Sequence, residues 1–240
     1  LNDVLKQNED YYVMKASPIN HNALTLEQFK KLKPDIVIAS MPQHFPTFEK
    51  LIKDYAPNAK LICHFGNTLW VVADYPYKNI MASIHPEPVP SGVNAVFYHQ
   101  EFDTNIFSYK EPHQNKNIYS FVHVLSGAEH YKQDWQTFID LEAMMPEWNF
   151  KSYGASCRDG AITGHQNIAD KMNESMFGFH LKSEGDGFGH IIHNWFAVGR
   201  PPIVKVDQYT NKLAGQLMID GVTGLAIDGL SIEQIKNKII

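Results

Sequence analysis

Residues 183–204, with the sequence SEGDGFGHIIHNWFAVGRPPIV, carry more information about this chain than any other segment. They open with alternating glycines, continue as an apolar helical stretch and end in a short β-branched run. Glycine allows a backbone to approach a ligand closely, and the amides that open a helix have no partner inside that helix. Because such a helix start attracts anions, above all a phosphate or diphosphate, we expect a charged small molecule to bind here.

Composition and charge are those of an ordinary globular protein. A chain of 240 residues, 44% hydrophobic and 20% charged, can form one large domain or two small ones. The net charge of -5 and the lack of a basic run argue against a nucleic-acid partner. Cys63 and Cys157 are the only cysteines, so a disulfide framework is excluded and we expect two reduced thiols. With no apolar run of about 18 residues and no signal peptide, we expect a cytoplasmic protein.

The order of apolar runs predicts two α/β halves. Strands are predicted at residues 35–39, 60–64, 79–82, 95–98, 118–125, 149–153, 176–181 and 202–206. Helices are predicted between them at residues 26–32, 45–55, 134–144, 168–172 and 191–198. This alternation indicates Rossmann-like halves with parallel sheets, at residues 1–112 and 113–240, joined by an aperiodic linker at 108–117.

Both ends of the sequence look cut. The chain begins at Leu1 without an initiator Met and stops at Ile240 inside an amphipathic helix pattern. The usual first strand and glycine-rich loop are not recognisable before Asp35. We therefore expect a fragment whose N-terminal half is incomplete.

Four ordered motifs resemble the retaining glycosyltransferases of the GT-B fold, of the family-4 type (glycosyl transferases group 1). They are DGFG at residues 186–189, AVGRP at 197–201, DGVTGL at 220–225 and YHQEFDTNIF at 98–107. The family pattern has a second Glu where this chain has Asn194. It also has an Arg after the first C-terminal strand, where this chain has Ser126 and Gly127.

The resemblance implies a glycosyltransferase that takes a sugar from a nucleotide-diphosphate-sugar donor, with retention of configuration and without a metal or another cofactor. It implies that residues 113–240 hold the donor and that the N-terminal half forms the acceptor side. Asp186 and His64 would act on the donor sugar as the catalytic residues. The donor-binding residues would be Gly127, Lys132, Glu184, Gly187, Phe188, Gly189, His190 and Asn194. The acceptor stays open between a glycan, a lipid and a small molecule, as does peripheral contact with a membrane.

Several alternatives stay open at this point. Another GT-B sugar-nucleotide enzyme, such as an epimerase or hydrolase, has the same motifs, and so has a non-catalytic module that binds a nucleotide sugar or a protein. His64 is also readable as an ordinary strand-end histidine, and Lys132 as a solvated lysine at a helix start. His190 and His193 have the i, i+3 spacing of metal ligands, but no third ligand accompanies them, so we expect no metal. Arg200 is expected to be structural.

Overall fold

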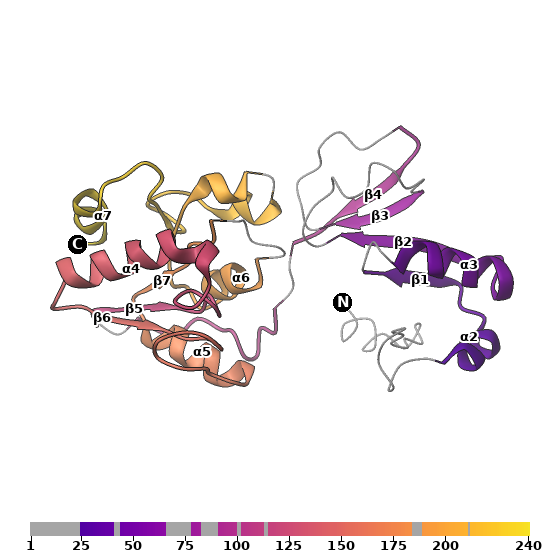
Figure 1. Cartoon of the computed structure of the whole chain (residues 1–240), viewed down its shortest axis with the longest axis horizontal. Coiled ribbons are helices and arrows are strands. Elements are labelled where there is room, and N and C mark those ends of the chain that lie inside the picture. Colours follow the sequence, from indigo (N-terminus) through magenta and orange to yellow (C-terminus); the bar gives the residue numbers. More distant parts are fainter. Residues whose placement is uncertain are drawn as a thin grey trace. The chain divides into compact units, whose positions relative to one another are not determined.

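The chain forms two compact units, each built on its own sheet (Figure 1). The computed structural model describes residues 25–40, 44–65, 78–82, 91–99, 102–112, 115–183, 189–210 and 212–240. Among these residues, the first unit runs to Phe97 and the second from Tyr98 to Ile240. This division lies earlier than the predicted one at residue 112. The physical reason is that Phe107 is buried with Tyr119 and Trp195 in the core of the second unit.

The first unit contains a parallel sheet of four strands in the order β1-β2-β3-β4. The strands are β1 (Ile36–Ala39), β2 (Lys60–Phe65), β3 (Asn79–Ala82) and β4 (Asn94–Phe97). Its helices are α2 (Leu26–Leu32) and α3 (Phe45–Tyr55). Thr25 and Gln28 form a capping box that starts α2, and Ile52 of α3 packs against Val37 of the sheet.

The second unit contains a parallel sheet of five strands in the order β6-β5-β7-β8-β9. The strands are β5 (Asn117–Ser120), β6 (Asn149–Ser152), β7 (Phe177–Phe179), β8 (Pro202–Val204) and β9 (Leu225–Ala226). The chain starts in β5, moves outward to β6 and returns to the other side of β5 in β7. The strand order therefore reverses between β5 and β7, and this is the topological switch point of the sheet.

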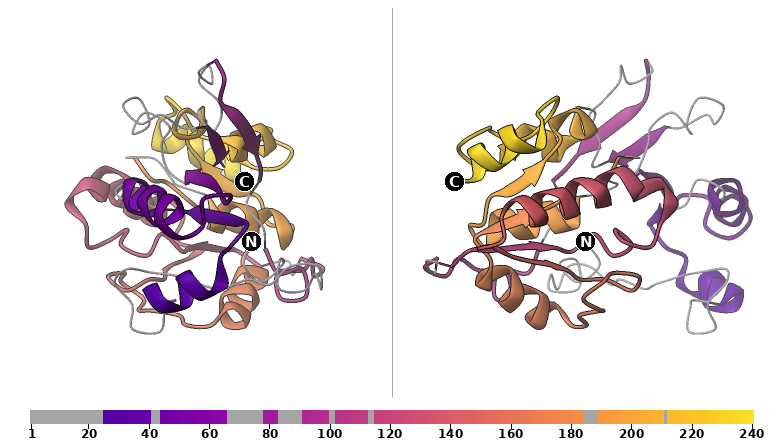
Figure 2. Two further views of the ribbon diagram at one scale, coloured as in Figure 1. Left: turned by 90° about the vertical axis from the view of Figure 1, so that its right-hand side faces the viewer. Right: turned by 60° about the vertical axis from the view of Figure 1, so that its left-hand side comes forward.

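Helices cover both faces of this second sheet, as Figure 1 and Figure 2 show for α4 and α7 on one face and α5 on the other. The helices are α4 (Lys132–Met144), α5 (His165–Glu174), α6 (His190–Ala197) and α7 (Ile232–Ile239). Short 3-10 helices lie between them: η3 (Glu129–Tyr131), η4 (Val206–Tyr209) and η5 (Leu213–Leu217). Phe138 of α4 and Ile235 of α7 share one core cluster, whereas Met172 of α5 and Trp195 of α6 share another. The helices after β5 and after β7 thus lie on opposite faces.

The predicted α/β class with two parallel sheets is confirmed. The strands predicted at residues 118–125, 176–181 and 202–206 are all shorter in the structure, and the first of them differs most. The strand predicted at residues 118–125 ends at Ser120, whose hydroxyl accepts a hydrogen bond from the amide of Val122. Leu125 then donates to the carbonyl of Val122 in a turn. The apolar run continues beyond the strand because the side chains of this turn are also buried, and burial alone does not distinguish a turn from a strand.

Arg200 holds the ends of several elements of the second unit together. Its side chain is 2% exposed. The guanidinium donates to the carbonyl oxygens of Asn173, Ser175, Val198 and Lys110 at 3.0, 2.9, 3.1 and 3.0 Å. These oxygens belong to the end of α5, the end of α6 and the segment that leads into β5. The predicted structural role of Arg200 is confirmed.

Replacement of Arg200 is expected to destabilise the second unit strongly. Arg200→Ala leaves four carbonyl oxygens without their donor, and each unsatisfied buried acceptor is costly, so we expect a loss of about 3 kcal/mol or more in the free energy of unfolding. Arg200→Lys restores only part of this loss because one ammonium cannot reach four oxygens. Urea denaturation measures both effects. Lys132→Ala, at an exposed surface pair, is the control and should cost less than about 1 kcal/mol. An Arg200→Ala protein as stable as this control would contradict the assignment.

Candidate functional site

The candidate site lies at the carboxyl edge of the second sheet, at the switch point between β5 and β7. In open α/β sheets, ligands bind outside the carboxyl ends of the strands at such a point, because adjacent loops there turn to opposite faces and leave a crevice. Two described segments flank this point, residues 121–128 after β5 and residues 180–183 after β7. The second of them leads into the glycine-rich segment that the sequence singled out.

The beginning of the glycine-rich segment is held by side chains from two other elements. The amide of Lys182 donates to Oε1 of Gln208 in η4 at 3.0 Å. The next amide, that of Ser183, donates to Oδ2 of Asp134 in α4 at 2.7 Å. The predicted site residues Glu184, Asp186, Gly187 and Phe188 follow directly and lie outside the described residues. The backbone that leads to them is therefore held by hydrogen bonds to two separate elements, η4 and α4.

The end of the segment is fixed by a third side chain. Gly189 is the N-cap of α6 with φ 70°, a left-handed conformation that favours glycine. Nδ1 of His193 lies 2.8 Å from the carbonyl oxygen of Gly189. A carbonyl can only accept, so this ring nitrogen carries the proton and donates. His193, which is 4% exposed, thus stabilises the start of its own helix from the inside of the protein.

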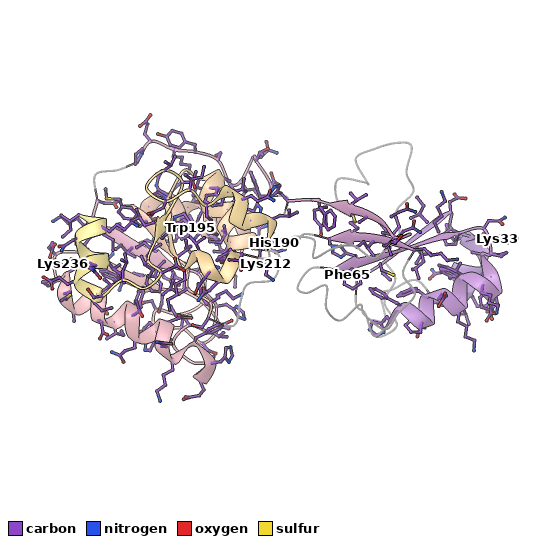
Figure 3. The ribbon with its side chains drawn as sticks, turned by 90° about the horizontal axis from the view of Figure 1, so that it is seen from above. Lys33, Phe65, His190, Trp195, Lys212 and Lys236 are labelled. Carbon is purple, nitrogen blue, oxygen red and sulfur yellow. The ribbon has the colours of Figure 1, made fainter. Side chains whose placement is uncertain are left out.

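The other predicted residues of α6 lie close to His193. His190 is exposed in the first turn of the helix, where Figure 3 labels it. Asn194 is half-buried one turn later, and its carbonyl accepts a hydrogen bond from the amide of Val198. The structure thus brings Gly189, His190 and Asn194 together on one short helix.

Gly127 and Lys132 flank the loop after β5. A Cβ atom on Gly127 would lie 2.8 Å from the Cβ atom of Ser156, so only glycine allows this loop to contact residues 153–160 so closely. The hydroxyl of Ser126 donates to the carbonyl of Ser156 at 2.9 Å. The side chain of Lys132 is 77% exposed and pairs with Glu129 at 3.4 Å. Lys132 therefore lies at the start of α4 with its ammonium in solvent, beside an acid that a diphosphate would have to displace.

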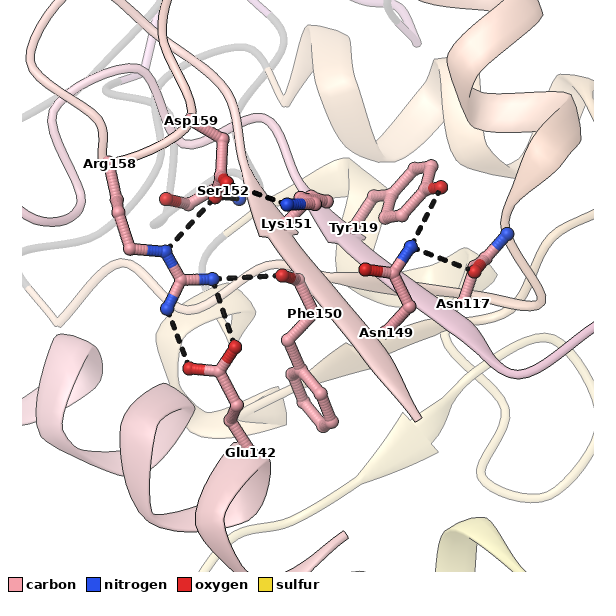
Figure 4. A network of polar contacts seen from close by, with 9 residues as sticks. All are labelled: Asn117, Tyr119, Glu142, Asn149, Phe150, Lys151, Ser152, Arg158 and Asp159. Atoms are coloured by element: carbon pink, nitrogen blue, oxygen red, sulfur yellow. Dashed lines mark hydrogen bonds and ion pairs between the residues drawn. The ribbon is translucent and has the colours of Figure 1, made fainter. Parts of the chain in front are cut away.

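A polar network holds the loop at residues 153–160 in place (Figure 4). Arg158 donates to both carboxylate oxygens of Glu142 in α4, at 2.6 and 3.1 Å, and to the carbonyl of Phe150 at 2.8 Å. Asp159 accepts hydrogen bonds from Lys151 and from the amide of Ser152. Although burial raises the pKa of Asp159, these hydrogen bonds outweigh it and hold that pKa below its usual value. The loop that contacts Gly127 is thus held to β6 and α4 by charged hydrogen bonds.

His64 belongs to the first unit, at the carboxyl end of β2. Its Nδ1 lies 3.1 Å from the hydroxyl of Ser40, which follows the adjacent strand β1. Burial lowers the pKa of His64 below its usual value, so the neutral imidazole is favoured. Its neighbour Cys63 is buried, and burial raises the pKa of that thiol to about 12. Cys63 and Cys157 are both free, as predicted.

The sequence analysis missed four residues that hold this segment. They are Asp134, Gln208, His193 through its contact with Gly189, and Lys205, whose Nζ lies 3.7 Å from Oδ1 of Asp134. Asp134 follows Lys132 by two positions, where an acidic residue reads as a favourable partner of the helix dipole and nothing more. Lys205 and Gln208 follow β8 and lack any motif. Their roles depend on hydrogen bonds between segments far apart in sequence, for which a single sequence has no signal.

The described residues contain no group of three or more His, Cys, Asp or Glu side chains that could hold a metal ion. None of their helices has both the length and the apolar character needed to cross a membrane.

Comparison with known proteins identifies the fold. Neither a protein-family model nor a curated protein sequence matches the chain. The structure of HepE from Anabaena in complex with UDP-glucose is similar with a TM-score of 0.64 at 13% identity, over 99% of this chain and 77% of HepE. A glycosyltransferase from Rickettsia africae is similar with a TM-score of 0.61 at 14% identity, over 99% of this chain and 76% of that one. The chain has the GT-B fold of glycosyltransferases.

A third GT-B structure is similar over a smaller share of its length. The pneumococcal O-GlcNAc transferase GtfA, in complex with UDP and GlcNAc, matches with a TM-score of 0.55 at 13% identity, over 88% of this chain and 50% of GtfA. This GT-B chain therefore spans about half of GtfA and about three quarters of HepE.

Replacement of Gly189 tests the geometry of the helix start. Gly189→Ala forces a side chain into a left-handed conformation and should lower the free energy of unfolding by about 1–2 kcal/mol. Gly229→Ala is the matched control, because Gly229 has φ 68° and a Cβ atom there would meet no atom within 4 Å. A Cβ atom on Gly189 would lie 3.4 Å from that of Ala214, so Gly189→Ala should cost at least as much as the control. Thermal unfolding measures both, and a smaller cost for Gly189→Ala would contradict this geometry.

The lowered pKa of His64 predicts a pH dependence of stability. The unfolded chain binds a proton at His64 more readily than the folded chain does. The neutral imidazole therefore makes its full contribution to the free energy of unfolding above the unfolded pKa of about 6.5, and this contribution decreases as the pH falls below that value. We expect the difference in unfolding free energy between the protein and its His64→Asn variant to shrink between about pH 7.5 and pH 5. Urea denaturation across this range measures it. A difference that is constant with pH would contradict the burial of the imidazole.

Proposed function

We propose that this chain is a glycosyltransferase that moves a sugar from a nucleoside-diphosphate-sugar donor to an acceptor. The observation that carries the proposal concerns the described ends of the glycine-rich segment. Lys182 and Ser183 before it and Gly189 after it follow β7 at the carboxyl edge of the second sheet of a GT-B fold, where Asp134, Gln208 and His193 hold them. The similar structures of HepE and GtfA contain UDP-glucose, and UDP with GlcNAc, respectively. These ligands support a nucleotide-sugar donor for this chain as well.

The proposed roles follow from charge. Departure of a nucleoside diphosphate develops negative charge, which preorganised donors and cations stabilise. The amides of Gly187, Phe188 and Gly189 at the start of α6 would supply the donors, and Lys132 would supply a cation. Asp186 and neutral His64 would orient the donor sugar. The reaction would proceed without a metal or another cofactor and with retention of configuration, as in the family-4 type.

The second candidate function is a non-catalytic module that binds a nucleotide sugar. Two departures from the family pattern favour it. Asn194 stands where the family has Glu, and an amide lacks the charge-assisted hydrogen bond of a carboxylate to a ribose hydroxyl. Ser126 and Gly127 stand where the family has Arg, so one of two cations for the diphosphate is missing. The missing Arg weakens stabilisation of the departing diphosphate, and the amide of Asn194 weakens recognition of the ribose.

Calorimetric titration with UDP, UDP-glucose, UDP-GlcNAc, GDP and GDP-mannose measures donor binding. Donor turnover is measured in parallel, with and without EDTA. We expect one donor to bind, and its turnover to be the same with EDTA as without it. Asp186→Ala and His64→Ala should each lower turnover by about a hundredfold or more. Asp140→Ala is the control and should have no effect, because Asp140 is a half-buried acid of α4 whose carboxylate accepts a hydrogen bond from Gln136 of the same helix. Binding without turnover would favour the non-catalytic module, turnover to an epimer or to free sugar alone would favour an epimerase or hydrolase, and no binding would contradict all of them.

A further inference from the structure

A buried carboxylate connects the elements that flank the switch point. The side chain of Asp134 is 0% exposed, in the first turn of α4. Its Oδ2 accepts the hydrogen bond from the amide of Ser183 at 2.7 Å. Its Oδ1 makes no hydrogen bond and lies 3.7 Å from Nζ of Lys205, which follows β8 and is 24% exposed. One carboxylate therefore contacts two different segments.

These contacts link segments that follow three adjacent strands of the sheet. Asp134 follows β5, Ser183 follows β7 and Lys205 follows β8, and these strands are adjacent in the order β5-β7-β8. The hydrogen bond from Ser183 to Asp134 consequently crosses from one side of the switch point to the other. It holds Ser183, the residue directly before the glycine-rich segment, to the helix that begins with Lys132.

Stability alone is a weak reason for a carboxylate at this place. Removing a charge from water is costly, and an ion pair at 3.7 Å, without a hydrogen bond, offsets that cost only in part. An apolar side chain of similar size would often be neutral for stability in such a position. A charged acceptor does provide what an apolar group cannot, namely a short and directional hydrogen bond to one backbone amide.

We propose that Asp134 is a positioning residue of the donor site, which holds the backbone at Ser183, directly before the glycine-rich segment, with Lys205 as its counter-charge. The inference rests on the proposed function, since it assumes that this segment binds a nucleotide sugar. Asp134 touches no substrate in this scheme. Its effect on donor binding passes entirely through one backbone hydrogen bond.

The hydrogen bond between Asp134 and Ser183 can be tested by removing either its acceptor or its donor. Asp134→Ala removes the acceptor, and Ser183→Pro removes the donor while the carboxylate remains. Ser183→Ala is the matched control because it keeps the amide, and Asp140→Ala controls for loss of an acid from α4. Calorimetry measures the Kd for UDP-glucose, or for whichever nucleotide sugar the intact chain binds. Hydrogen exchange of the peptide that contains Ser183 is followed in the same proteins.

We expect Asp134→Ala and Ser183→Pro each to raise Kd by about ten- to a hundredfold, the worth of a hydrogen bond to a charged group. The double variant should be no weaker than either single one, because both remove the same contact. Exchange at Ser183 should become faster in Asp134→Ala and stay unchanged in both controls. If Asp134→Ala does not fold, Ser183→Pro alone decides, since Ser183 is exposed on the surface.

The outcomes separate this inference from the function on which it rests. If the intact chain binds no nucleotide sugar, the proposed function is wrong and the positioning role falls with it. If the intact chain binds a donor and Ser183→Pro binds it equally tightly, the positioning role alone is overturned. Additive losses in the double variant would overturn it as well, because they would mean that Asp134 acts on the donor by another route.

Discussion

The guanidinium of Arg200 is the contact on which the arrangement of the second unit depends. Five N–H donors in a rigid planar group can reach four carbonyl oxygens at once, which is more than the three donors of a lysine ammonium can serve. Here those oxygens come from the ends of α5 and α6 and from Lys110 in the segment before β5. The ends of helices leave carbonyls without partners, and a buried end requires a donor. Arg200 supplies it for two helices on the same face of the sheet.

The two edges of this sheet are stabilised in different ways. At the amino edge, Arg200 binds main-chain oxygens, and Asn149 donates to Asn117 on the neighbouring strand and to the hydroxyl of Tyr119 (Figure 4). These contacts fix the register of strands and the ends of helices. At the carboxyl edge, Asp134 and Gln208 accept from amides of a loop, and His193 donates to one of its carbonyls. Side chains there hold the backbone on either side of the glycine-rich segment, and a ligand site needs such support from neighbouring side chains.

The sequence predicted the fold well, because parallel strands that are buried on both faces leave a strong pattern. The predicted helix at residues 45–55 matches α3 in full, and the strand at 79–82 matches β3. The prediction was weakest at residues 118–125, where buried residues of a turn continued the apolar run of β5. It also missed that residues 98–112 belong with the second unit, because the anchoring of Phe107 depends on residues of α5 and α6.

The sequence by itself determined the class of fold, the order of strands and helices, and the glycines at the start of α6. These are local properties, set by apolar periodicity and by the conformational freedom of glycine. Only the tertiary structure decided that Asp134, Gln208 and His193 hold the glycine-rich segment, that Arg200 joins helix ends and that Lys132 points into solvent. Such roles arise from contacts between segments up to ninety positions apart, as between Lys110 and Arg200. Which residue becomes a partner at that distance depends on the order of strands in the sheet and on the placement of the helices. A single sequence has no local signal for such a pairing.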